Sequence, residues 1–101
     1  MLLAQVLGTV VSTRKDCGLL GLKLLLAREL DGAFKPTGNY VVAADAVGAG
    51  THELVLLAQG SSARMTEVSR DKPVDAVIVG IVDAVEIDGK DVYLKRAGAA
   101  R

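Results

Sequence analysis

The fold of this chain is decided between residues 40 and 58, which read Tyr40-Val-Val-Ala-Ala-Asp45-Ala-Val-Gly-Ala-Gly50-Thr-His-Glu-Leu-Val55-Leu-Leu-Ala58. Apolar runs at both ends of this stretch flank a loop in which Gly48 and Gly50 enclose Ala49. Glycine has no Cβ, so the backbone at these two positions can adopt a positive φ or approach another backbone closely. The stretch therefore predicts two strands, residues 40–46 and 53–59. The loop between them has almost no side-chain bulk, which suits a place where several backbone segments crowd together.

Further strands are predicted on the N-terminal side of this stretch. Over residues 3–12 one set of alternate residues is apolar and the other is mixed, and Gly8 within them marks a bulge or a sharp bend. Residues 22–30 have good helix propensity, but the glycines before them and the Asp-Gly pair after them favour a strand. Residues 31–39 are rich in turn residues and are expected to form a connection.

The C-terminal half is expected to contain one short helix, a fifth strand and a hairpin. Ser61 or Ser62 can cap one or two helical turns after the fourth strand. Residues 74–85 form the most apolar segment and are rich in β-branched side chains, which favour a strand. Asp88-Gly89 supplies a type I′ turn for a hairpin over residues 86–94. Short strands separated by turn signals predict a mainly β fold, a small antiparallel barrel or sandwich.

The fourth and fifth predicted strands lack the alternation of a strand that faces water on one side. Residues 54–57 and 76–82 contain only apolar residues and one glycine, so both faces of these strands must be covered. A single domain at residues 1–96, with a flexible tail at 97–101, has little chain left to cover them. We therefore expect a second copy of the chain to do so. The candidate subunit-interface residues are Leu54, Leu56, Arg64, Val77, Val79 and Ile81.

Charge and composition argue against several classes of function. The 12 Lys and Arg residues balance 12 Asp and Glu residues, so the basic excess of a nucleic-acid-binding protein is absent. The apolar runs are shorter than the ~20 residues that span a bilayer, and the N-terminus lacks the basic segment of a signal peptide. His52 and Cys17 are the only residues of their types, and no motif makes them a metal site or a nucleophile and base. We expect no catalytic residue, metal, cofactor, nucleic acid or membrane partner.

Five segments of the chain, taken in order, resemble a known family. They are residues 8–13, 21–26, 44–50, 60–64 and 73–83. This set is similar to that of the vertex proteins of bacterial microcompartments, the carboxysome and ethanolamine-utilisation vertex protein family. The resemblance implies a barrel similar to the oligonucleotide-binding fold (OB-fold), assembled as a homopentamer in the bacterial cytoplasm. Such pentamers plug the vertices of a polyhedral protein shell that is otherwise tiled by hexameric shell proteins.

The resemblance also implies a place for the glycine loop. In a pentamer it would lie near the five-fold axis, where five backbones converge on a narrow opening. The residues of this axis or pore loop are Val47, Gly48, Ala49, Gly50 and Thr51. A head-to-tail interface closes into such a ring when each subunit is rotated by about 72° from the last. The expected partners are the chain itself and the hexameric shell proteins. Two alternatives stay open, a nucleic-acid-binding module on an OB-fold and a small enzyme for which the residues suggest no reaction.

Overall fold

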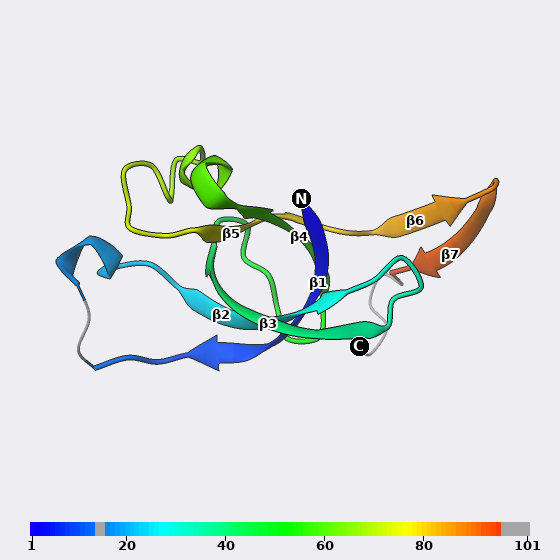
Figure 1. Ribbon diagram of the computed structural model, residues 1–101, viewed down its shortest axis with the longest axis horizontal. Helices are drawn as coiled ribbons and strands as arrows, with labels where there is room; N and C mark the ends of the chain where they lie inside the picture. Colours follow the sequence, from blue (N-terminus) through cyan, green and yellow to red (C-terminus); the bar gives the residue numbers. More distant parts are fainter. Residues whose placement is uncertain (14–15, 96–101) are drawn as a thin grey trace.

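The fold is described by a computed structural model for residues 1–13 and 16–95 (Figure 1). The described part of the chain forms, in order, β1 (Leu2–Val10), η1 (Cys17–Leu19), β2 (Leu24–Leu30), β3 (Pro36–Asp45), β4 (Leu54–Gln59), η2 (Gly60–Arg64), β5 (Ala76–Ile81), β6 (Ala84–Ile87) and β7 (Lys90–Leu94). Both η elements are 3-10 helices. The predicted boundary between the domain and its tail, after residue 96, lies outside the described residues.

Five of the strands close into a barrel in the order β1-β2-β3-β5-β4, and β6 and β7 form a separate two-stranded sheet. Neighbouring barrel strands are antiparallel except β3 and β5, which are parallel. The register between β1 and β2 shifts between Val6 and Gly8, at the predicted irregularity. Such bulges bend a strand and help a sheet to close. The mainly β barrel with a C-terminal hairpin is thus confirmed.

The barrel is filled by alternate residues of its strands, together with one residue from the glycine loop. These residues are Ala4, Val6, Leu25, Ala27, Ala43, Ala49, Val55, Leu57, Ala76 and Ile78, all at most 2% exposed. Half of them are alanines, and small side chains suit the narrow interior of a five-stranded barrel.

A second apolar cluster lies on the outer face of β4 and β5. Ala58 and Val77 pack there with Ala63 of η2 and the partly buried Val74. The chain segment that begins with η2 and leads into β5 therefore covers this face itself. We expected that a single domain would have too little chain left to cover this face, and at this end of the strands that expectation is wrong. The apolar pattern of residues 76–82 could not show that Ala63 of η2 would pack against them.

The third strand begins at Pro36, earlier than predicted. Asp31 makes this possible, because its Oδ1 accepts hydrogen bonds from the backbone N–H groups of Ala33 at 2.8 Å and Lys35 at 3.1 Å. The Asp31 N–H also donates to the Lys35 carbonyl at 2.9 Å. This compact turn brings Pro36 opposite Leu30, and the register with β2 shifts before Tyr40 pairs with Arg28. Proline is tolerated here as the first residue of a strand.

Residues 74–85 do not form one strand as predicted. The chain leaves the barrel after Ile81, where the Val82 N–H still donates to the Leu54 carbonyl at 2.9 Å, and β6 begins at Ala84. Figure 1 shows the β6–β7 hairpin extending away from the barrel. Asp88 and Gly89 at its tip have φ of 52° and 79°, the positive values that a type I′ turn requires.

The predicted short helix after the fourth strand is present as the 3-10 helix η2, but its predicted serine cap is wrong. Gln59 occupies the N-cap position without a side-chain hydrogen bond. The Ser62 hydroxyl instead donates backward to the Gln59 carbonyl at 2.7 Å. Serine hydroxyls can bond to the carbonyl three residues earlier in the chain, and Ser62 does so here.

Candidate oligomer interface and glycine loop

The first half of the glycine loop is held by one carboxylate. Asp45, at the end of β3, is only 9% exposed. Its Oδ1 accepts hydrogen bonds from the backbone N–H groups of Val47 and Gly48, each at 3.1 Å, and its Oδ2 accepts one from Ala49 at 3.0 Å. Aspartate commonly bonds the backbone that follows it in turns. One buried carboxylate therefore fixes residues 47–49 of the loop from within the same chain.

The second half of the loop is held by another carboxylate. Glu53, just before β4, accepts a hydrogen bond from the Gly50 N–H on Oε1 at 2.5 Å. Its Oε2 forms an ion pair with Lys95, which follows β7. A Cβ added at Gly50 would lie 3.2 Å from Glu53 Oε1, so glycine leaves room for this bond. The ion pair also ties the base of the hairpin to the glycine loop.

The loop is docked onto β1 at its far end. The His52 N–H donates to the Val6 carbonyl at 2.7 Å, and the Val6 N–H donates to the Glu53 carbonyl at 3.0 Å. Ala49 points into the barrel and is 2% exposed. Its side chain packs in the barrel core, so only the backbone of Ala49 could take part in an opening.

The other four predicted axis residues lie on the surface. Gly48, Gly50 and Thr51 are exposed, and Val47 is 40% exposed. Gly48 has a φ of 77° and open space around it, so glycine is needed there for its backbone conformation and not for space within the chain. The loop thus presents backbone and small side chains to the outside in one fixed conformation.

The six predicted interface residues divide into three groups. Val77 is fully buried and Leu54 is 4% exposed within one chain, so neither side chain has much surface to offer a second copy. Leu56, Val79 and Ile81 are partly buried, and Val79 packs beside the outer cluster while Ile81 packs against the barrel core. Arg64 is exposed and has no ion pair or hydrogen bond with another described residue.

Sequence reasoning missed an exposed apolar strip on β3. Tyr40 is 62% exposed and Val42 is 46% exposed, whereas Val41 and Ala43 between and beside them face inward. Residues two apart share one face of a strand, so the spacing of Tyr40 and Val42 was the signal for this strip. It is a second surface that a neighbouring copy could cover.

The described residues offer little for chemistry. They contain no group of three His, Cys, Asp or Glu side chains that could hold a metal ion. Cys17 is exposed on η1, remote in the chain from the glycine loop. None of the helices described is long and apolar enough to cross a membrane.

Comparison with known proteins decides the family. The family described as ethanolamine utilisation protein EutN/carboxysome matches residues 1–83. The chain belongs to this family. The resemblance that the sequence suggested is therefore confirmed, while the hairpin after residue 83 lies beyond the family match.

Members of the EutN/carboxysome family are similar to this chain along nearly its whole length. The carboxysome shell vertex protein CcmL of Synechocystis is 51% identical over 96 residues, which cover 95% of this chain and 96% of the relative. The bacterial microcompartment shell vertex protein EutN of Salmonella typhimurium is 46% identical over 95 residues, covering 94% of this chain and 96% of the relative.

Solved structures of the EutN/carboxysome family share the fold. A carboxysome subunit CcmL has a TM-score of 0.91 at 51% identity and covers 95% of this chain and 100% of its own. GrpN from Rhodospirillum rubrum, described as a pentameric microcompartment shell protein, has a TM-score of 0.77 at 46% identity and covers 86% of this chain and 98% of its own.

Proposed function

We propose that this chain is a structural shell protein that forms a homopentamer and caps the five-fold vertices of a polyhedral bacterial microcompartment in the cytoplasm. The observation that carries the proposal is the 51% identity, over 95% of the chain, to a protein named as a carboxysome shell vertex protein. The likeness to GrpN, a pentameric shell protein by description, supports the number of subunits. The named relatives are structural shell proteins, and we infer from this that the present chain has no catalytic activity.

The glycine loop is suited to a ring of copies. Asp45 and Glu53 hold its amides from within the same chain, so its conformation does not depend on a ligand or a neighbour. Five such loops could approach an axis closely, because Gly48, Gly50 and Thr51 carry little side-chain volume. We place Val47, Gly48, Gly50 and Thr51 at this axis.

The subunit interface would use surfaces that one chain leaves partly open. Leu56, Val79 and Ile81 are partly buried, and Arg64 has no described partner. A neighbour that covers the three aliphatic side chains gains roughly 25 cal/mol for each Å² of apolar surface removed from water. A carboxylate of the neighbouring copy could pair with Arg64. Rotation by about 72° per copy would close this head-to-tail contact into a ring.

The mass of the purified protein in solution tests the proposal. Light scattering or native mass spectrometry should give a particle five times the 10.5 kDa mass of the chain at micromolar concentration. A monomer under these conditions would contradict it. Co-purification with hexameric shell proteins tests whether these proteins are partners of the chain. Salt-sensitive binding to single-stranded DNA or RNA would instead favour the nucleic-acid-binding alternative.

A further inference from the structure

A pocket of about 280 Å³ lies on the outside of the barrel. It is lined by residues of the barrel, among them Gln5 of β1, Arg28 of β2 and Leu54 at the start of β4, and by Tyr93 of β7. Figure 1 shows β7 returning from the hairpin tip toward the turn between β2 and β3. The hairpin, which the proposed function leaves without a role, therefore completes this pocket.

The pocket contains one positive charge that no acidic group neutralises. Arg28 is half-buried, and its Nε and Nη2 donate to the neutral Gln5 Oε1 at 3.1 and 2.8 Å. Gln5 in turn donates from Nε2 to the His52 carbonyl at 3.4 Å. None of the residues that line the pocket is Asp or Glu. Nη1 and the second N–H of Nη2 therefore remain for an acceptor, and a guanidinium binds a carboxylate well through two such N–H groups.

The remaining walls are aromatic and aliphatic. Phe34 and Tyr93 form a tilted pair with ring centroids 6.0 Å apart and an angle of 36° between the planes. Leu30 and Leu54 complete the apolar lining. The pocket thus offers an anion both the Arg28 guanidinium and apolar surface, a combination typical of small-molecule sites.

Two pocket residues hold an unfavourable backbone conformation. Phe34 and His52 have φ of 63° and 71°, and they are two of the four described non-glycine residues with positive φ. This region disfavours a bulky side chain such as phenylalanine. Strained residues persist where the surrounding structure holds them, and they gather at ligand sites. The Asp31 turn holds Phe34, and the bond to the Val6 carbonyl holds His52.

We infer that this pocket binds a small organic monocarboxylate whose body is aromatic or branched aliphatic, with the carboxylate on Arg28 and the apolar body against Phe34 and Tyr93. The volume of about 280 Å³ is at the lower end for ligand pockets, which selects a benzoate-sized molecule over a nucleotide. The inference is independent of the proposed function, since all the residues that form the pocket belong to one chain.

The inference is tested by titrating the full-length protein, in the assembly that it forms, with benzoate. Calorimetry and the NMR shifts of pocket amides monitor the binding. Benzoate should bind saturably with a dissociation constant on the order of 1–10 mM. Benzyl alcohol, which has the ring without the charge, and inorganic phosphate, which has the charge without the ring, should each bind at least about tenfold more weakly.

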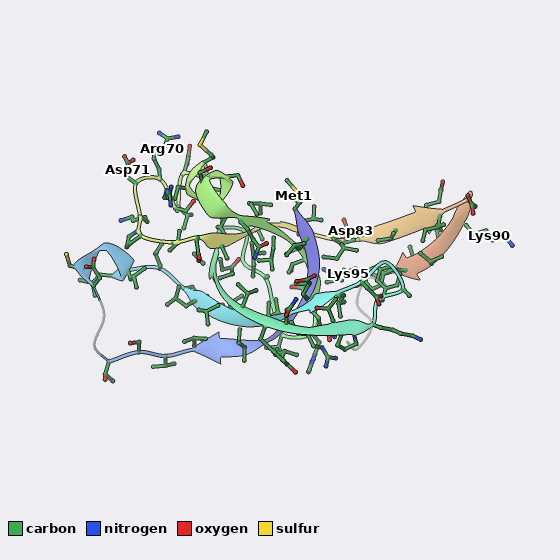
Figure 2. The ribbon with its side chains drawn as sticks, viewed as in Figure 1. Met1, Arg70, Asp71, Asp83, Lys90 and Lys95 are labelled. Carbon is green, nitrogen blue, oxygen red and sulfur yellow. The ribbon has the colours of Figure 1, made fainter. Side chains whose placement is uncertain are left out.

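Matched arginine variants assign the binding to this pocket. Arg28→Met keeps an unbranched, flexible side chain but removes the guanidinium, and should weaken benzoate at least about tenfold. Arg70→Met removes an exposed arginine at the opposite end of the molecule from the hairpin tip at Lys90, as Figure 2 shows, and should leave benzoate binding unchanged. Circular dichroism and light scattering of each sample record folding and assembly separately.

The inference is overturned by any of three results: no saturable binding of benzoate, equal binding of benzyl alcohol or phosphate, or equal loss in both arginine variants. If Arg28→Met does not fold, Tyr93→Leu replaces it. This variant removes the aromatic wall and should weaken benzoate several-fold, and unchanged binding would count against the pocket.

Discussion

At the scale of single residues, Asp45 determines the conformation of the glycine loop. Both of its oxygens accept backbone N–H groups, and the residue is 9% exposed. Asp45→Asn would turn an amide NH₂ toward one of these donors and leave a buried N–H unpaired. We expect the free energy of unfolding to fall by about 1–3 kcal/mol. Chemical denaturation at one fixed chain concentration measures this change.

Asp75→Asn is the matched control for this prediction. Asp75 is exposed and its side chain accepts no hydrogen bond from another described residue. It should change stability by no more than ~0.5 kcal/mol. If both variants are equally stable, the three bonds to Asp45 do not fix the loop.

Asp31 makes the stability of the β2–β3 turn depend on pH. Hydrogen bonds from the N–H groups of Lys35 and Ala33 lower the pKa of Asp31 from its ordinary value of 3.8. A lowered folded-state pKa means that the ionised form stabilises the fold above the unfolded-state pKa. This contribution is lost as the pH falls through the lower, folded-state pKa.

We therefore expect the loss of stability on acidification below about pH 4 to be smaller in Asp31→Asn than in the natural chain. The asparagine oxygen can still accept the backbone N–H groups but does not titrate. Denaturation at pH 7 and at pH 3 gives the comparison. Asp71→Asn, which removes an exposed acid from a different turn, is the comparison variant. Identical acid sensitivity in Asp31→Asn and the natural chain would contradict the prediction.

At the scale of elements, the sequence predicted which segments form strands but missed two strand ends that depend on pairing with other segments. The barrel strand around Gly8 and the hairpin turn at Asp88-Gly89 were predicted from the residue types at these positions and their immediate neighbours in the chain. The end of β5 was not, because it is reached where the neighbouring strand β4 begins at Leu54, and Gly80 lies within β5 and not after it. The start of β3 was missed because Pro36, a residue typical of turns, pairs with Leu30 of β2.

The candidate interface shows the same limit. The apolar run of β5 correctly indicated burial on both faces, but it could not tell which part the same chain would cover. Val77 is covered by the segment that includes Ala63 of η2, whereas Val79 two residues later is only partly buried. Which residues of β5 are buried by the same chain depends on how η2 packs over the sheet. This packing joins two segments, and the sequence pattern of neither segment alone predicts it.

This difference between Val77 and Val79 leads to a prediction for β5. Val77→Asp would bury a charge without a partner, which costs several kcal/mol, and should prevent folding. Val79→Asp can keep its charge near the surface of one chain, so the chain should fold, while a neighbour that covers this position would bury the charge. We expect folded but smaller particles. Circular dichroism reports folding and light scattering reports mass, and a normal pentamer of Val79→Asp would remove Val79 from the interface.

At the scale of the whole molecule, the apolar surface of a single chain exceeds what its fold requires. Tyr40 and Val42 on β3, Met65 after η2 and Leu94 on β7 are all exposed, on the barrel and on the hairpin alike. The extents of 45 × 27 × 26 Å reflect a barrel with a hairpin that reaches beyond it. A ring gives each chain two different neighbours and can therefore cover two separate surfaces, which a two-fold dimer with one shared patch does not.

Closure of this ring can be tested at the glycine loop. Gly48→Leu adds a side chain where five loops are proposed to converge, and nothing within 4 Å in the same chain obstructs it. Its φ of 77° also adds backbone strain of roughly 1 kcal/mol. Gly21→Leu is the matched control, since Gly21 has a φ of 83°, equally open surroundings and a place outside the loop. Native mass spectrometry should show fewer pentamers for Gly48→Leu than for Gly21→Leu at the same concentration. Equal loss in both would attribute the effect to strain, and unchanged pentamers in both would place the loop away from the axis.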